Sequence, residues 1–170
     1  LLEFNVLDTL ASLRTAYIQT EDGMGFKLRF SEVQDNVLEF GTAVKINLYG
    51  CTLLKEPSPD RYLICGMSGV NLIDVSQGTV VPSVRKISEL TADDIYTYVT
   101  LTDTEFAFKR GAYLDIAEHN DYKFMDGWAS LLIDDEGSSI YAPVNVNCEW
   151  RRTGEGLPQG TGNTTGIIVS

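Results

Sequence analysis

Apolar and polar residues alternate with a period of two along much of the chain, which predicts β-strands rather than amphipathic helices. The clearest case is 43–48, which reads Ala-Val-Lys-Ile-Asn-Leu. Residues 16–19 and 26–30 alternate in the same way, and the turn-forming residues 20–25 lie between them. This arrangement predicts a β-hairpin followed by a further strand.

A second hairpin is predicted around Ser58, because the residue types on its two sides mirror each other. Pro57 and Pro59 exclude a strand there and require a loop. The symmetry places Cys51 directly opposite Cys65, with their Cβ atoms about 4.5–5.5 Å apart. We therefore weigh two interpretations, a disulfide between these cysteines and two thiols packed as small apolar side chains.

The second half of the chain is predicted to begin with a short helix and to continue as strands. Thr91 and Asp94 have the spacing of a capping box, which favours a helix over 88–95. β-Branched and aromatic residues then dominate several of the remaining apolar segments. We expect one strand before the helix, at 70–75, and four after it, at 96–102, 128–133, 140–144 and 164–169.

Two hairpins with acidic turns occur at similar places in the two halves of the chain. Residues 17–26 and 131–140 each combine an apolar strand, two or three acidic residues, Gly and a second apolar strand. A strand led by Gly follows each of them later, which suggests two copies of one module. We predict an all-β fold of two tandem small Greek-key OB-like barrels, at 1–86 and 87–170; a single β-sandwich is the alternative.

The stretch 17–54 has the most specific pattern in the chain. After the acidic hairpin it reads Gly41-Thr-Ala-Val-Lys-Ile-Asn-Leu-Tyr-Gly-Cys51, and a second, looser match covers 98–106 and 157–168. This pattern resembles the OB-like domains of uncharacterised cell-surface lipoproteins of Bacteroidetes, a family of domains of unknown function. The resemblance implies an exported binding protein at the cell surface or in the periplasm. It also implies membrane attachment only through a lipid anchor upstream of Leu1, and it supplies no catalytic residues.

The charge of the chain narrows the classes of partner. There are 13 Lys and Arg against 24 Asp and Glu, a formal net charge of −11. This balance argues against nucleic acid, which is bound by neutralising phosphates with basic side chains, and against an anionic membrane surface. The excess of acid is concentrated in 87–170, whose net charge is −9 against −2 for 1–86.

The residues that usually carry catalysis or metal binding are sparse. His119 is the single histidine and has no companion at metal-ligand spacing, and the acidic turn 134–137 lacks the alternating ligands of a calcium loop. No nucleophile motif accompanies a positioned base. We therefore expect a protein that is not an enzyme and that uses no cofactor or metal.

Aromatic side chains are the remaining indication of a ligand. Flat aromatic faces beside carboxylates suit sugar rings, and OB folds bind oligosaccharides on one face and its flanking loops. The candidate ligand-binding residues are Trp128, Trp150, Tyr113 and Tyr122. We expect a non-enzymatic binding module, with glycan as the first ligand class and another surface protein, within a larger exported assembly, as the alternative. A single-stranded nucleic-acid binder is a third interpretation, which the charge opposes.

Overall fold

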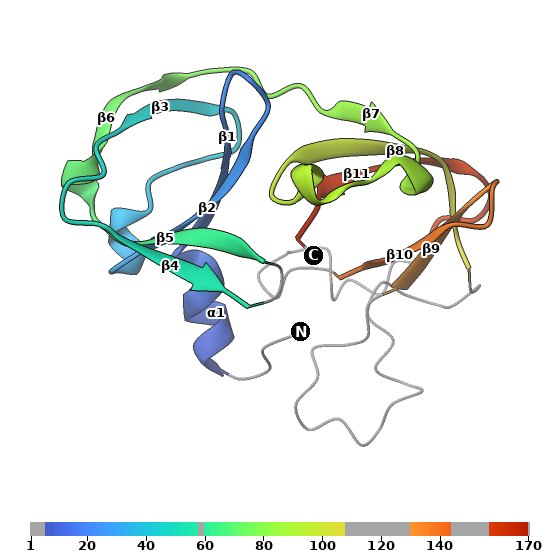
Figure 1. The fold of residues 1–170 in the computed structure, drawn as a ribbon, viewed down its shortest axis with the longest axis horizontal. Coiled ribbons are helices and arrows are strands. Elements are labelled where there is room, and N and C mark those ends of the chain that lie inside the picture. The colour runs from blue at the N-terminus through green and yellow to red at the C-terminus, as the bar shows by residue number, and fades with distance from the viewer. Residues whose placement is uncertain (1–5, 58–59, 108–129, 144–156, 170) are drawn as a thin grey trace. The chain divides into compact units, whose positions relative to one another are not determined.

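The structure is a computed structural model that describes residues 6–57, 60–107, 130–143 and 157–169 (Figure 1). Its regular structure is mostly β-strand, arranged in several sheets, and this confirms the expected β class. Within the described ranges no sheet closes into a barrel. The two tandem barrels therefore stay a prediction.

The chain order of the elements is as follows. One α-helix of the described part, α1 (Val6–Leu13), precedes the strands. The strands are β1 (Thr15–Gln19), β2 (Gly25–Phe30), β3 (Thr42–Ile46), β4 (Thr52–Glu56), β5 (Arg61–Met67), β6 (Leu72–Gln77), β7 (Ser83–Arg85), β8 (Tyr98–Phe106), β9 (Ser130–Asp134), β10 (Ser139–Ala142) and β11 (Gly162–Ile167). Short 3₁₀ turns lie between them: η1 (Val33–Asp35), η2 (Gly69–Asn71), η3 (Ile87–Glu89) and η4 (Ala92–Asp94).

The chain divides into two compact units. The β1–β6 unit consists of 13–83, 91–99 and 165–170, and the β9–β10 unit consists of 1–12, 84–90 and 100–164. Two segments from the second half of the sequence thus belong to the unit that contains most of the first half. Because compactness is not independent folding, the division into modules at 1–86 and 87–170 stays a prediction.

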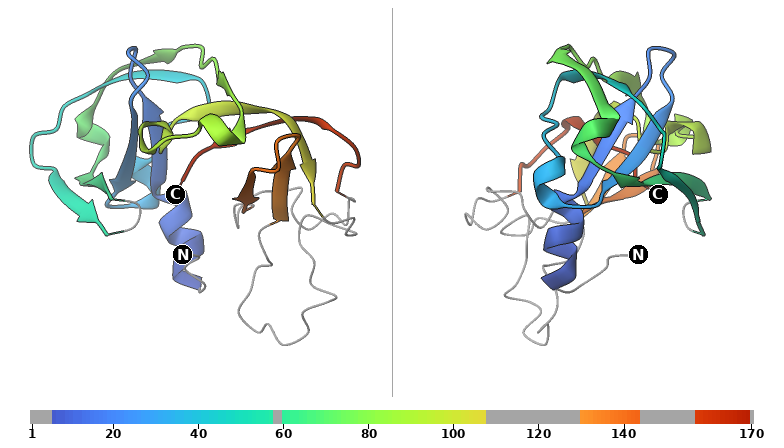
Figure 2. Two further views of the ribbon diagram at one scale, coloured as in Figure 1. Left: turned by 45° about the vertical axis from the view of Figure 1, so that its right-hand side comes forward. Right: turned by 90° about the vertical axis from the view of Figure 1, so that its left-hand side faces the viewer.

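The β1–β6 unit is built on a four-stranded sheet with the order β1-β2-β5-β4. β2 and β5 run parallel, whereas β1–β2 and β4–β5 are antiparallel hairpins. A separate antiparallel ribbon, β3–β6, packs against one face of this sheet (Figure 2). The core between them is formed by Leu28, Phe30 and Met67, with Ile46 and Leu72 from the ribbon. The alternation that predicts β2 and β3 is therefore the alternation that fills this core.

The β9–β10 unit contains the second acidic hairpin. The sheet that includes it has the order β10-β9-β8-β11, and β7 also pairs with β8. The two acidic turns have the same hydrogen bonds: Thr20 N donates to Met24 O and Gly23 N to Thr20 O, and Asp134 N donates to Ser138 O and Gly137 N to Asp134 O. Both Gly23 and Gly137 have positive φ, at 92° and 82°. The repeated sequence pattern thus produces the same turn twice.

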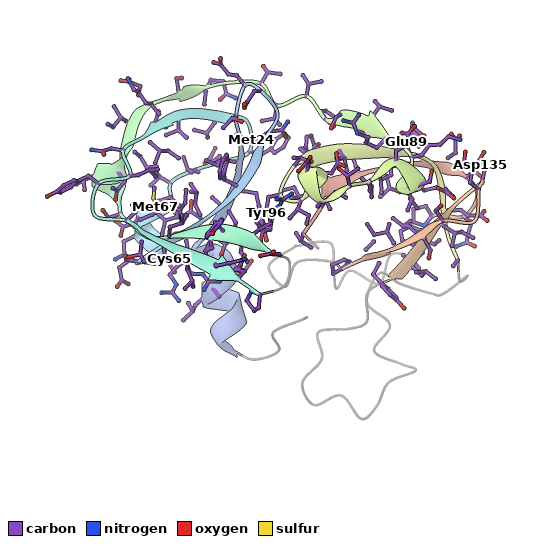
Figure 3. The ribbon with its side chains drawn as sticks, viewed as in Figure 1. Met24, Cys65, Met67, Glu89, Tyr96 and Asp135 are labelled. Atoms are coloured by element: carbon purple, nitrogen blue, oxygen red, sulfur yellow. The ribbon has the colours of Figure 1, made fainter. Side chains whose placement is uncertain are left out.

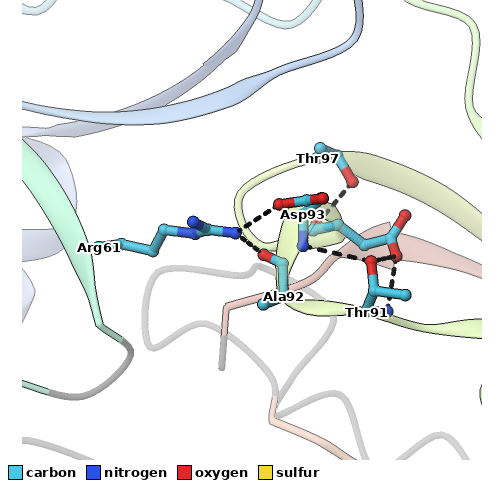
Figure 4. A network of polar contacts seen from close by, with 6 residues as sticks. Arg61, Thr91, Ala92, Asp93 and Thr97 are labelled. Atoms are coloured by element: carbon cyan, nitrogen blue, oxygen red, sulfur yellow. Dashed lines mark hydrogen bonds and ion pairs between the residues drawn. The ribbon is translucent and has the colours of Figure 1, made fainter.

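The structure corrects the predicted helix over 88–95. It forms two 3₁₀ turns, η3 and η4, in its place. The predicted capping box is present, since Thr91 N and Oγ1 both donate to Asp94 Oδ2 at 2.8 and 3.0 Å (Figure 4). The box closes only one turn because the chain leaves helical geometry at Ile95, which has extended backbone.

The predicted register of the second hairpin is wrong by one residue. Glu56 pairs with Arg61 at the end of the hairpin, so Cys65 lies opposite Thr52 rather than Cys51. A slip of one residue moves a side chain to the other face of a sheet. Both cysteines are half-buried free thiols, so of the two interpretations the structure has the packed thiols and not the disulfide. The Cys51 thiol instead lies 3.4 Å from the sulfur of Met67, beside the core.

Candidate functional site

The aromatic residues predicted to bind a ligand lie outside the described residues. Trp128, Tyr113 and Tyr122 fall within 108–129, and Trp150 falls within 144–156. His119 and Cys148 lie in the same two segments. Their roles stay predictions, and the candidate site is sought in the rest of the chain.

The first candidate is a largely buried polar cluster in the β1–β6 unit, which we name the Glu56 cluster (Tyr17, Lys27, Glu56 and Tyr96). Lys27 Nζ lies 2.8 Å from Glu56 Oε1, and the Tyr96 hydroxyl donates to Glu56 Oε2. Tyr96 is labelled in Figure 3. The rings of Tyr17 and Tyr96 are 5.5 Å apart, and the ammonium of Lys27 lies 5.8 Å from the centre of the Tyr96 ring. The Glu56 carboxylate therefore binds both the Lys27 ammonium and the Tyr96 hydroxyl.

Strand register and backbone conformation bring these four residues together. Tyr17 and Lys27 are directly opposite each other across the β1–β2 hairpin, so their side chains share a face. Tyr96 lies in the segment 91–99 and has a left-handed φ of 68°. A Cβ on Gly25 would lie 2.3 Å from the carbonyl carbon of Tyr96, so only glycine permits this approach.

The same segment is held to the sheet by further polar contacts. Arg61 donates to the carbonyl oxygen of Ala92 and pairs with Asp93 at 3.3 Å (Figure 4). The backbone N–H of Tyr98 donates to Gln19 Oε1 at 3.1 Å. The Glu56 cluster is thus one part of a fastening that attaches 91–99 to the sheet.

The electrostatics of the Glu56 cluster favour a structural role. Burial raises the pKa of Tyr96, and the hydrogen bond to Glu56 raises it further. Burial also raises the pKa of Tyr17. For Glu56, burial acts to raise the pKa, but the hydrogen bonds from Lys27 and Tyr96 outweigh it and the pKa is lowered. A tyrosine that acts as a base or nucleophile needs a lowered pKa, so the shifts of these tyrosines run against that chemistry.

The second candidate is a pair of loops, 47–50 and 68–71, which we name the Asn71 loops. The Asn71 side chain is 5% exposed and makes four hydrogen bonds. Its Nδ2 donates to the carbonyl oxygens of Asn47 and Tyr49 at 2.7 and 3.1 Å. Its Oδ1 accepts from the backbone N–H and the hydroxyl of Ser68, both at 2.9 Å. One buried amide thereby joins the two loops.

Local sequence explains why these loops form. Ser68 and Asn71 make a reciprocal capping box around η2. In the other loop, Asn47 Oδ1 accepts from Tyr49 N at 3.0 Å, and Gly50 has a positive φ of 83°, as such a turn requires. The spacing Ser-x-x-Asn and the Asn-x-x-Gly turn are visible in the sequence, but the prediction of a ligand site from tryptophans missed both.

The Asn71 loops present apolar side chains to solvent. Tyr49 is 89% exposed and Val70 is 86% exposed, and Leu48 is exposed as well. The polar groups of Asn47, Ser68 and Asn71 are engaged with one another. The loops therefore offer apolar contact area around the Tyr49 ring, while the Asn71 amide that joins them has all its hydrogen bonds within the protein.

In the acidic turn of the β9–β10 unit, one oxygen of Asp134 and the carboxylate of Glu136 are engaged with protein groups, whereas Asp134 Oδ2 is buried without a hydrogen-bond partner among the described residues. Asp134 Oδ1 accepts from Glu136 N and Ser138 N, and Glu136 accepts from Lys86 and Ser88 at 2.5 and 2.9 Å. In the part of the chain that the structure describes, no three His, Cys, Asp or Glu side chains are grouped as metal ligands. Nor do the described ranges contain a helix of the length and hydropathy that spanning a bilayer requires.

Comparison with known proteins adds no assignment. No family model, no curated protein and no solved structure matches the chain. The function is therefore argued from the residues of the chain itself.

Proposed function

We propose that this chain is a non-enzymatic interaction module that binds another protein through the Asn71 loops. The observation that carries the proposal is the exposure of Tyr49 and Val70 on loops held by a buried, fully hydrogen-bonded amide. Loops held in place in this way lose little conformational entropy on binding. Exposed apolar side chains on such loops are suited to fill a pocket on a partner.

The chemistry of the loops favours a protein over a glycan. A sugar site combines an aromatic face with polar side chains that bind hydroxyl groups. Here the side chains next to Tyr49 and Asn71 in the sequence include Leu48 and Val70, which offer no hydrogen bonds. The Ser68 hydroxyl and the Asn71 amide already bond each other, and Asn71 Nδ2 also bonds the Asn47 carbonyl oxygen. The protein alternative of the sequence analysis is therefore the better supported one.

The wider setting of the module rests on the sequence pattern. The resemblance of 17–54 to OB-like domains of bacterial surface lipoproteins supports an exported module with an anchor upstream. The OB fold is a partly open barrel, so the open sheets of the β1–β6 unit are compatible with an OB-like relationship. Both statements belong to the proposal.

The test compares two matched double variants. Tyr49→Ser with Val70→Ser removes the apolar loop side chains, and Tyr141→Ser with Val84→Ser removes one exposed Tyr and one exposed Val from the β9–β10 unit. Proteins captured from the source cells by the immobilised chain are identified and purified, and their affinity for each variant is measured by calorimetry.

We expect the loop variant to weaken binding of a purified partner at least tenfold and the control variant to leave it unchanged, with equal melting temperatures. Equal loss in both variants contradicts the proposal. Binding of a polysaccharide panel that is lost in the loop variant assigns the loops to glycan instead. If glycan binding is lost only when Trp128 or Trp150 is substituted, the ligand site lies in the segments predicted from the sequence.

A further inference from the structure

The two edges of the four-stranded sheet in the β1–β6 unit differ in how they are protected. β1 and β4 are the edge strands of this sheet in the described structure. An edge strand presents unpaired N–H and C=O groups, and proteins usually cover or block it. Whichever edge is left open is a place where another strand can pair.

The β1 edge is covered. The side chain of Asn36 donates through Nδ2 to the carbonyl oxygens of Leu13 and Thr15, at 2.9 and 3.3 Å. Residues Thr15–Ile18 are half-buried. These features cover the start of β1, where Asn36 engages the carbonyl oxygen of Thr15 and the residues are half-buried.

The β4 edge is open. Residues Thr52, Leu53, Leu54 and Lys55 are all exposed, and β4 pairs only with β5 among the described strands. Leu53 is 62% exposed and Leu54 is 50% exposed. Since neighbouring residues of a strand point to opposite faces, apolar surface is exposed on both faces of this one strand. A strand added at this edge covers both leucines at once.

A charged side chain on an edge strand usually discourages pairing with another strand, but the charges of β4 are paired within the chain. Lys55 is the cation of β4, and its ammonium pairs with Asp60 at 2.8 Å across the hairpin loop. Glu56, at the end of the strand, is engaged by Lys27 and Tyr96. With Arg61, the charges at this end of the hairpin sum to zero. A second copy of this hairpin therefore meets no net repulsion at this edge, despite the charge of −11 on the whole chain.

We propose that a second copy of this chain pairs with this edge, β4 against β4, antiparallel about a two-fold axis. The two four-stranded sheets then form one continuous eight-stranded sheet. A two-fold axis normal to the sheet keeps corresponding faces on the same side, so a residue pairs with one on its own face. This proposal does not depend on the Asn71 loops.

The residue pattern selects one register. Centred on Leu54, all five residues of β4 pair: Leu54 opposite Leu54, Leu53 opposite the aliphatic stem of Lys55, and Thr52 opposite Glu56. A register centred on Lys55 places two ammonium groups opposite each other, which is unfavourable. One centred on Leu53 pairs only three residues of the strand. The Leu54 register alone satisfies both length and charge.

The first test is the mass of the chain in solution as a function of concentration. Two five-residue strands bury a small interface, so we expect a weak dimer. Light scattering and sedimentation are measured from roughly 1 µM to 1 mM, a range that spans weak and moderate affinities. The expected result is a rise from 18.8 kDa toward twice that mass. A constant mass of 18.8 kDa over the whole range overturns the proposal.

Two further measurements locate the interface. Leu54→Lys places two ammonium groups opposite each other and is expected to remain monomeric, whereas Val81→Lys, an exposed apolar residue elsewhere in the same unit, is expected to dimerise like the unaltered chain. In the unaltered chain, amide hydrogen exchange over 52–56 is expected to slow as concentration rises. Dimerisation of Leu54→Lys, or protection that rises with concentration only outside 52–56, overturns the proposal. The exchange measurement decides the matter if Leu54→Lys does not fold.

Discussion

The Glu56 cluster and the Asn71 loops each contain buried polar side chains in the same unit, but the two have different roles. The first is charged and faces a segment of the same chain, which it fastens to the sheet. The second is neutral and holds two loops whose apolar side chains face solvent. Burial of a polar group is therefore not by itself the mark of a functional site. What distinguishes the two is what the satisfied hydrogen bonds leave exposed.

The largest effect on stability is expected at Gly25, which permits the close approach of Tyr96 in the Glu56 cluster. Gly25→Val places a Cβ 2.3 Å from the carbonyl carbon of Tyr96, where backbone atoms on both sides must move. We expect the free energy of unfolding to fall by about 3 kcal/mol, through loss of the fastened segment. Urea denaturation measures this loss. Gly162→Val is the matched control, because Gly162 also begins a strand, has no positive φ and has an open Cβ position.

The second change removes the donor from the Asn71 loops while keeping their acceptor. Asn71→Asp retains an oxygen for Ser68 but sets a carboxylate oxygen against the carbonyls of Asn47 and Tyr49. We expect a loss of about 2 kcal/mol at neutral pH, because buried acceptors face one another without a donor. Since the folded state then favours the protonated acid, part of this loss is recovered as pH falls through the raised folded pKa. Amide exchange over 47–50 follows the loosening; unchanged exchange at neutral pH speaks against the role of Asn71.

The third change, Glu56→Gln, replaces the charged group of the Glu56 cluster with a neutral amide like that of Asn71. Because the folded pKa of Glu56 lies below its ordinary value of 4.5, its contribution to stability is present above pH 4.5 and is lost as pH falls through the lower folded pKa. Glu56→Gln is expected to cost about 1 kcal/mol at neutral pH and to remove this acid-dependent part of the stability. Thermal melts between pH 2 and 7 measure it. An unchanged acid profile in Glu56→Gln shows that other carboxylates set the acid sensitivity.

The smallest effect on stability is expected at the exposed end of the Asn71 loops. Tyr49→Ser changes a side chain that is mostly in water, so we expect the free energy of unfolding to change by less than about 0.5 kcal/mol. A thermal melt checks this value against the unaltered chain. A loss of more than about 1 kcal/mol assigns Tyr49 to the core of the unit and removes it from the proposed contact surface.

Most strands of the described chain could be predicted from the sequence, because period-two alternation and turn residues are local signals. Register could not be predicted so well. Similar residue types on the two sides of Ser58 allow two alignments that differ by one residue, and the sequence pattern does not distinguish the one that forms. The helix α1 was not predicted, although Val6, Leu10 and Leu13 have helical spacing. Its eight residues are too few to give a strong periodic signal.

The candidate site was less predictable than the fold. The sequence pattern predicts Tyr96 only as the start of a strand. Its position against Gly25 and Glu56 depends on contacts between distant parts of the chain, which a local pattern does not contain. The pattern likewise predicts a strand at Asn71, but Ser68 and Asn71 have cap spacing and Asn71 lies in η2. Local spacing can identify a cap, but only the tertiary structure shows that the cap joins a second loop and leaves Tyr49 exposed.

The long reach of the contacts around Tyr96 has a consequence for the order in which the chain folds. Gln19 and Tyr98 are 79 residues apart, whereas the β1–β2 hairpin closes over a few residues. Closing a long loop is slow, so we expect the hairpin to form early and the segment 91–99 to dock after the folding transition state. Contacts that form late govern how fast a native protein opens rather than how fast it folds. Gly25 and Tyr96 are therefore expected to set the lifetime of the folded state.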